Sequence, residues 1–229
     1  MSWSGGKDCA LALWLLQNDD QMEVVSLHTT IEEQTGRVGL HGVHETLIED
    51  QARAIGLPLE KIYFSRSGDN NAYEKAMEGY LQKLLDRNIR HIAFGDILLE
   101  DLKEYRERTL MMNGFEGIFP LWGKDTGHLA KTIIEEGFRT KICAADADKI
   151  DKPWVGADYT SSFINGLPED VDPCGENGEF HTFCYDGPIF QNRLNIEVRQ
   201  LVARSYDLEK KEGDREKKNF WFADLVSEV

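Results

Sequence analysis

Close to the N-terminus lies a glycine-rich turn, Ser4-Gly-Gly-Lys-Asp8, that leads directly into the apolar stretch Cys9–Leu16. Two adjacent glycines let a backbone approach a ligand closely and adopt positive φ at little steric cost. The apolar stretch predicts a helix over Cys9–Gln17, whose first N–H groups have no partner inside the helix. Such donors, with the positive end of the helix dipole, form an anion site. Lys7 adds a mobile cation suited to phosphate. We therefore predict a phosphate-binding loop, the alternative being a surface turn that only caps the helix.

Neither common glycine-rich nucleotide motif is present, because the Walker spacing and the three spaced glycines of the dinucleotide fingerprint are both absent. The string instead resembles the pyrophosphate loop of the PP-loop (N-type) ATP pyrophosphatases. That resemblance implies cleavage of ATP between its α and β phosphates, transfer of AMP to a carbonyl or carboxylate oxygen, and release of pyrophosphate. It also implies that Ser4 and the loop amides hold the pyrophosphate.

Composition excludes several classes of function. The 229 residues suffice for one large domain or two small ones, and no apolar run approaches the roughly 20 residues of a membrane span. No signal peptide is visible. The net charge of −15 disfavours nucleic acid as a partner, although a local group of donors can still bind a nucleotide. Four widely spaced cysteines fit reduced thiols in a cytoplasmic protein.

Strands and helices alternate over the first 125 residues, which implies a doubly wound parallel sheet with helices on both faces. Only Met1–Trp3 precede the loop. We expect either a very short strand there or a true start further upstream, and we favour the second because strands normally need about five residues. The helices are predicted over Cys9–Gln17, Val43–Ile55, Tyr73–Arg87 (with Ala76, Tyr80 and Leu84 on one apolar stripe) and Asp101–Met112, and the strands over Met22–Thr30, Lys61–Ser65, His91–Gly95 and Gly117–Leu121.

The pattern changes after Trp122. We predict a helix over Thr126–Glu136, a strand over Phe138–Ala145, and an irregular Pro- and Gly-rich stretch to about Gly187. An antiparallel hairpin follows, with strands over Asn195–Tyr206 and Phe220–Val226 and the charge run Glu209–Lys218 as a solvated loop tip. The chain thus divides into a nucleotide domain, 1–125, and a smaller α+β acceptor domain, 126–229.

A second motif, Pro173-Cys-Gly-Glu-Asn-Gly-Glu-Phe-His-Thr182, places two carboxylates and two glycines in a turn-rich segment. Glu176 and Glu179, three residues apart, could bind Mg²⁺ through oxygen or could bind an amine. An ordinary exposed acidic turn is the alternative.

The two motifs together resemble the diphthine–ammonia ligase family, which carries loops like Ser-Gly-Gly-Lys-Asp-Ser and Gly-Glu-Gly-Gly-Glu-Phe-Glu-Thr. The resemblance runs from Ser2 to about residue 226, and three positions depart from it. Cys9 replaces the usual Ser, which exchanges a hydroxyl for a weak thiol donor. Asn177 and His181 stand where the family often has Gly and Glu. Further similar stretches are His41-Gly42-Val43, Gly95-Asp96, Pro120–Gly123, Glu136–Phe138, Trp154–Gly156 and Phe220–Leu225.

Several other positions are candidates because ligands bind at the carboxyl ends of parallel strands. We expect Leu27, His28 and Thr29 to end the second strand and to read adenine, with His28 lining the pocket. Asp96, after Gly95, would contact Mg²⁺ or ribose. His41 is either a pocket residue or a surface histidine.

Other residue types leave two interpretations open. Cys9 is a small apolar side chain or a low-pKa thiol at a helix start. Arg106 and Arg108 are equal candidates to clamp a phosphate. Trp122 and Trp154 could stack on adenine, although packing is the favoured interpretation.

The predicted site divides into three overlapping groups. The catalytic group is Lys7, Asp8, Asp96, Glu176 and Glu179, and the metal ligands are Asp8 and Asp96. The nucleotide-binding group is Ser4, Gly5, Gly6, Lys7, Asp8, Cys9, Leu27, His28, Thr29, His41, Gly42, Gly95 and Asp96.

The resemblance implies an ATP- and Mg²⁺-dependent amide ligase that adenylates diphthine, a modified histidine of elongation factor 2, and then amidates it with ammonia. Two alternatives stay open. The family also has bacterial members, and bacteria make no diphthamide, so the acceptor would then be another compound. A module that binds ATP or AMP without turnover is the second alternative. The sequence leaves a homo-oligomer open.

Overall fold

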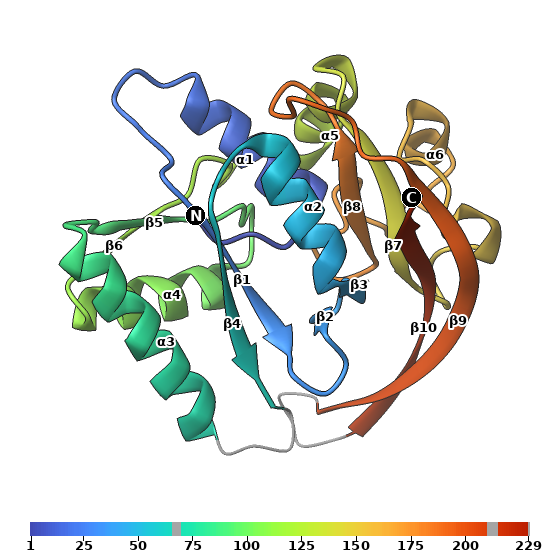
Figure 1. Cartoon of the computed structure of the whole chain (residues 1–229). Coiled ribbons are helices and arrows are strands. Elements are labelled where there is room, and N and C mark those ends of the chain that lie inside the picture. The colour runs from blue at the N-terminus through green and yellow to red at the C-terminus, as the bar shows by residue number, and fades with distance from the viewer. Residues whose placement is uncertain (66–69, 210–214, 229) are drawn as a thin grey trace.

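The computed structural model shows a mixed α/β fold with parallel strand pairs and a separate antiparallel sheet (Figure 1). It describes residues 1–65, 70–209 and 215–228. The helices are α1 (Lys7–Gln17), α2 (Glu45–Ile55), α3 (Asn70–Asp86), α4 (Glu100–Met112), α5 (Thr126–Glu135) and α6 (Ser161–Asn165), with a 3₁₀ turn at Lys152–Trp154. The strands are β1 (Leu27–Glu32), β2 (Arg37–Val38), β3 (Val43–His44), β4 (Leu59–Phe64), β5 (His91–Ala93), β6 (Glu116–Ile118), β7 (Arg139–Asp146), β8 (Phe180–Asp186), β9 (Ile196–Glu209) and β10 (Arg215–Ser227).

The segment Met1–Trp3 connects the two parallel strand pairs of the N-terminal half. Strand β1 runs parallel to β4, and β5 runs parallel to β6. Between these pairs, the Trp3 N–H donates to the His28 carbonyl and the Ser2 N–H donates to the Ala93 carbonyl, both at 2.8 Å. Of the two alternatives for this segment, the described residues show a very short extended stretch that bridges His28 and leads directly into the glycine-rich turn, and the favoured start further upstream stays a prediction.

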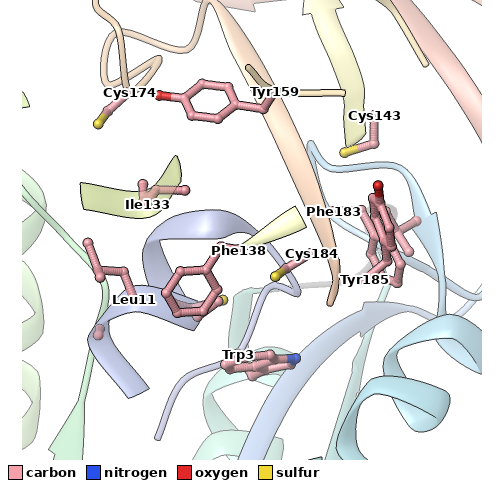
Figure 2. Close-up of a cluster of buried hydrophobic side chains, with 14 of the residues drawn as sticks. Trp3, Leu11, Ile133, Phe138, Cys143, Tyr159, Cys174, Phe183, Cys184 and Tyr185 are labelled. Carbon is pink, nitrogen blue, oxygen red and sulfur yellow. The ribbon is translucent and has the colours of Figure 1, made fainter. Parts of the chain in front are cut away.

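Hydrophobic clusters cover this parallel region on two sides. Helices α3 and α4 pack on one side, where Tyr80 and Leu84 of the predicted apolar stripe are buried with Phe94 and Leu110. The larger cluster contains α1 and α2 and continues into the antiparallel sheet, where Leu11 lies near Phe138 (Figure 2). The two halves of the chain therefore share one continuous core.

The antiparallel sheet has the strand order β8-β7-β10-β9. The predicted hairpin is confirmed, but its strands are longer, because Arg215 pairs with Glu209 and the ladder continues to Lys218. The prediction of a loop over Glu209–Lys218 is therefore wrong at both ends, and residues 210–214 lie outside the described residues. Strand β8 also replaces part of the irregular stretch predicted to end at Gly187. The glycines just before β8 favoured a loop in the sequence analysis, so its run of aromatic and β-branched residues was not predicted as a strand.

Among the described residues, no helix combines the length and the apolar character needed to cross a bilayer.

Candidate functional site

The glycine-rich loop adopts a conformation that only glycine allows at its first turn. Gly5 has φ +83°, and a Cβ there would lie 2.7 Å from both Gln51 Oε1 and Ile48 Cδ1. Gly6 is extended and caps α1, which begins at Lys7 rather than at the predicted Cys9. Because both glycines are buried, the loop is not an exposed surface turn.

Strand β8 holds the loop from the opposite half of the chain. The carbonyl of Gly5 accepts from the Cys184 N–H at 2.8 Å, and the Lys7 N–H donates to Thr182 Oγ1 at 3.0 Å. The Gly6 N–H donates to Ser4 Oγ at 3.3 Å. Two of the amides predicted to bind phosphate thus have partners within the protein, which a phosphate would have to displace or share.

Lys7 is fixed in place and is not the mobile cation that the sequence predicted. Its side chain is 2% exposed, and Nζ lies 2.9 Å from Asp8 Oδ2 and 2.5 Å from the Cys174 carbonyl oxygen. The rings of Tyr159 and Phe180 lie 5.7 and 5.4 Å from Nζ. Burial alone would lower the pKa of Lys7, but the Asp8 carboxylate and its other partners outweigh burial and raise it. Lys7 therefore stays charged.

Carboxylates from three parts of the chain lie near the start of α1. Burial raises the pKa of Asp8 and of Asp96, and the Arg106 charge opposes the rise at Asp96. The two lie close together, because a Cβ on Gly95, the residue before Asp96, would lie 2.9 Å from the Asp8 carbonyl carbon. Arg106 Nε lies 2.8 Å from Asp96 Oδ2. Glu176 Oε2 accepts from the Leu98 N–H at 3.1 Å, and burial, followed by Asp8, raises the pKa of Glu176 to about 7. The structure thus brings together Lys7, Asp8, Asp96 and Glu176.

Glu179 is buried inside the second motif and accepts hydrogen bonds from the residues around it. It is 4% exposed, and its carboxylate accepts from the N–H groups of Asp172 at 3.1 Å and Asn177 at 2.9 Å. The Asn177 side-chain amide donates to it as well, at 3.0 Å. With these bonds Glu179 is a positioning residue that holds the turn bearing Glu176. A direct contact between Glu179 and substrate remains a prediction.

His41 lies against the loop. Its Nδ1 donates to the Thr182 carbonyl at 3.2 Å, its ring centroid is 4.7 Å from that of His181, and a Cβ on Gly6 would lie 3.1 Å from its Cε1. Burial lowers the pKa of His41 to about 4, so the ring is neutral at pH 7. His41 is thus half-buried beside the loop, and its contact with a nucleotide stays a prediction. Its neighbour Gly42 serves packing, because a Cβ there would lie 2.5 Å from the Phe222 ring.

The predicted position of Leu27, His28 and Thr29 is wrong. Strand β1 begins at Leu27, opposite Leu59, so these residues lie at its amino end, and Thr30–Glu32 form its carboxyl end. His28 Nδ1 lies 3.0 Å from the Tyr80 hydroxyl, and burial lowers the pKa of His28 to about 3.

The structure also decides between the interpretations of Cys9, the two arginines and Trp154. Cys9 is buried, its thiol donates to the Gly6 carbonyl at 3.1 Å, and burial raises its pKa, which does not fit a reactive thiolate. Arg106 pairs with Asp96, whereas Arg108 is exposed on α4. Trp154 packs edge-on against Phe163 at 5.2 Å between centroids.

Sequence reasoning missed Gln51, which is fully buried in α2. Its Nε2 donates to the carbonyls of Gly5 at 2.9 Å and Cys184 at 2.5 Å, and its Oε1 accepts from Trp3 Nε1 at 2.9 Å. The available signal was a polar side chain on the apolar stripe of Ile48, Ala52 and Ile55. Gln51 thus connects the strand before the loop, the loop itself and β8.

The oxygen ligands of the site decide whether it fits Mg²⁺. No group of three or more His, Cys, Asp or Glu residues able to hold a metal occurs in the described part of the chain. Mg²⁺ at nucleotide sites, however, takes one or two carboxylates and completes its shell with phosphate oxygens and water. Asp8 supplies a buried Oδ1 without a hydrogen-bond partner, and Asp96 supplies a second carboxylate. These residues fit Mg²⁺ bound together with a nucleotide.

Gly95 sets the distance between Asp96 and Asp8, because a Cβ there would lie 2.8 Å from the Cys9 backbone nitrogen and 2.9 Å from the Asp8 carbonyl carbon. We expect Gly95→Ala to lower the free energy of unfolding by about 1–3 kcal/mol, as overpacking does. Urea denaturation measures this. Gly79→Ala, inside α3 with nothing within 4 Å, is the control and should gain up to about 1 kcal/mol. Equal effects of both substitutions would contradict the tight approach.

Glu176 makes stability and activity depend on pH. Its pKa lies above the ordinary 4.5 in the folded state, at about 7, so the folded protein holds the proton more tightly. The free energy of unfolding should therefore fall as pH rises between these values and stay level above them. If the carboxylate form acts, kcat/KM rises through about pH 7, and Glu176→Gln removes both trends. The exposed Glu116→Gln should change neither, and identical profiles for both variants would refute the assignment.

Comparisons with known proteins identify the family of the chain. Residues 1–116 match the family model described as the diphthamide synthase N-terminal domain, and residues 125–224 match its C-terminal domain. A human protein is 24% identical over 225 residues and a bovine one 25% over 228, each alignment covering 89% of this chain and 84% of the relative. A Schizosaccharomyces pombe protein is 24% identical over 220 residues, which cover 88% of this chain but only 36% of that relative.

All three relatives carry the name diphthine–ammonia ligase, so the enzyme class predicted from the sequence is the class that they name. Both domain models match in the expected order, and the N-terminal model alone covers residues 1–116. The chain belongs to the diphthamide synthase family.

Proposed function

We propose that this protein is an ATP-dependent amide ligase that adenylates a diphthine-type carboxylate, releases pyrophosphate and then amidates the carboxylate with ammonia. The observation that carries the proposal is the buried loop at the start of α1, where a charged Lys7 lies among Asp8, Asp96 and Glu176. Membership of the diphthamide synthase family and the names of the relatives support it.

The first step forms an acyl-adenylate. An oxygen of the acceptor carboxylate attacks the α phosphorus, and the bond between that phosphorus and the bridging oxygen to the β phosphate breaks, so pyrophosphate leaves. The amides of Gly5, Gly6 and Lys7 and the positive end of α1 would stabilise the charge that develops on the phosphates. Because Lys7 is already fixed, its charge needs no reorganisation during the reaction.

The second step forms the amide. The ammonia nitrogen attacks the acyl carbon, and the bond from that carbon to the AMP oxygen breaks. Glu176, with a pKa of about 7, suits the removal of a proton from the attacking nitrogen at neutral pH. Asp8 and Asp96 would hold Mg²⁺, which supplies positive charge against the phosphate oxygens when it is bound.

The fold supports this placement of ATP. The backbone bonds of Met1–Trp3 to β1 and β5 place the strands in the order β4, β1, Met1–Trp3, β5, β6. We infer a doubly wound sheet of the PP-loop type. In such a sheet the strand order reverses at one point, here beside the loop, and ligands bind at that point. We also propose the boundary near residue 125, between a nucleotide domain and an acceptor domain.

The proposed partner is elongation factor 2 carrying diphthine, and the proposed location is the cytoplasm. Each of the four cysteines is a free thiol, as expected in a reducing compartment.

The test is pyrophosphate release by the purified protein with ATP, Mg²⁺ and ammonium. Elongation factor 2 bearing diphthine should give pyrophosphate, AMP and amide in equal amounts. Turnover with a different carboxylate alone would show another acceptor. Tight ATP binding without pyrophosphate under every acceptor would contradict the ligase and indicate a nucleotide-binding module.

A further inference from the structure

Exposed apolar side chains are concentrated on one short segment beside the site. Of the nine large apolar side chains that are exposed in the described residues, five lie between Leu98 and Met112. We name them the α4 face: Leu98, Leu99, Tyr105, Met111 and Met112, with exposed fractions of 49, 45, 49, 73 and 71%. Tyr105 and Met112 are seven residues apart and therefore share one side of α4, and Met111 lies on the neighbouring stripe of the helix.

The opposite side of α4 already has its partners. Leu110 is buried in the cluster with Phe94, and the Arg106 guanidinium lies 4.3 Å from the Phe94 ring centroid. The α4 face is therefore not a core face that awaits another part of the described chain. Single exposed apolar residues need no explanation, but five of them within 15 consecutive residues make this segment a candidate interaction surface.

The α4 face adjoins the reacting groups. The Leu98 N–H bonds the Glu176 carboxylate at 3.1 Å, and Arg106 of the same helix pairs with Asp96 at 2.8 Å. The helix is about 20 Å long, given a rise of about 1.5 Å per residue over its 13 residues, and Arg106 in its middle still reaches Asp96. A protein that docks along α4 would thus place its nearest side chains beside Glu176 and Asp96.

The charge around the α4 face favours one kind of binding partner over the others. The same helix carries four exposed carboxylates, of which Glu107 pairs with Lys103 at 2.7 Å, and one exposed arginine, Arg108, and the whole chain carries −15. These carboxylates belong to Glu100, Asp101, Glu104 and Glu107. A second copy would oppose this acidic border with itself across a two-fold axis, and an anionic membrane would be repelled. A protein whose apolar contact is bordered by Lys and Arg fits it.

We propose that the α4 face docks the protein that presents the acceptor carboxylate, a folded partner with a basic border around an apolar contact. The inference rests on the proposed function, because it assumes that the acceptor is a protein side chain. It adds a residue-level docking surface, outside the nucleotide loop, that determines acceptor affinity.

The test compares Met111→Ser/Met112→Ser with Met22→Ser, which makes the same chemical change at a residue 40% exposed before β1. The probe is elongation factor 2 bearing diphthine, with its dissociation constant measured by fluorescence anisotropy and ATP affinity measured in parallel. The double variant should bind the probe about 10-fold more weakly or worse, a loss typical of central interface residues. Its ATP affinity and the behaviour of Met22→Ser should match the wild type.

Binding that weakens with added salt is also expected, since the border is charged. Equal affinity of wild type and double variant for the probe, or no binding by the wild type, overturns the docking surface. So does a wild-type dimer that the double substitution converts to a monomer. Because binding is measured without turnover, a wild type that binds the probe yet releases no pyrophosphate refutes the proposed function and leaves the docking surface supported.

Discussion

Asp8→Asn is expected to lower kcat/KM for pyrophosphate release by about 100- to 1,000-fold, the range found when a preorganised charge-stabilising group is removed. The substitution keeps the size of the side chain but removes the negative charge that lies 2.9 Å from Lys7 Nζ. It also removes the carboxylate whose Oδ1 has no hydrogen-bond partner and is available to a cation. Steady-state kinetics with saturating Mg²⁺ measure the change.

The matched control is Asp50→Asn. Asp50 also lies on a helix, and its side chain is 25% exposed, against 27% for Asp8. It pairs with Arg53 and accepts from Ser227, outside the candidate site. Activity of the control should stay within about twofold of wild type. If Asp8→Asn loses no more activity than Asp50→Asn, Asp8 has no part in the reaction.

Gln51→Leu is expected to lower the free energy of unfolding by about 3–5 kcal/mol, because buried polar groups left unpaired are destabilising by about 1–3 kcal/mol each. The indole N–H of Trp3 and the Cys184 carbonyl both lose their bond to Gln51. The Gly5 carbonyl keeps the Cys184 N–H as a partner, so the loop is weakened rather than released. Guanidinium denaturation followed by tryptophan fluorescence measures the loss.

Gln82→Leu serves as the comparison, since Gln82 is exposed on α3 and donates to its helical neighbour Asp86. That variant should stay within about 0.5 kcal/mol of wild type. A Gln51→Leu protein with wild-type stability would show that this buried amide does not hold the loop together.

The local pattern was enough to predict the family, the position of the glycine-rich turn before α1 and most helices. Glycines next to an apolar helix indicate a phosphate loop, and helical spacing identified Tyr80 and Leu84 as buried. Both predictions depend only on residues that are close together in the sequence. The family match then follows from two such motifs in order, which the comparisons confirm.

What the sequence could not predict depends on contacts between distant segments. The start of β1 is set by Leu59 opposite Leu27, and that register is invisible in the apolar run that begins at Met22. Thr182 reaches Lys7 across 175 positions, so the partners of the loop amides could not be foreseen. The burial of Lys7 likewise follows from Tyr159 and Phe180, which come from the other half of the chain.

The most direct measurement is a crystal structure with a non-cleavable α,β-methylene analogue of ATP and Mg²⁺. The β and γ phosphates should lie within hydrogen-bonding distance of the backbone N–H groups at the start of α1, with the α phosphorus open toward Glu176. A nucleotide bound elsewhere, while the Lys7 N–H still donates to Thr182 and the loop stays closed, would contradict the account.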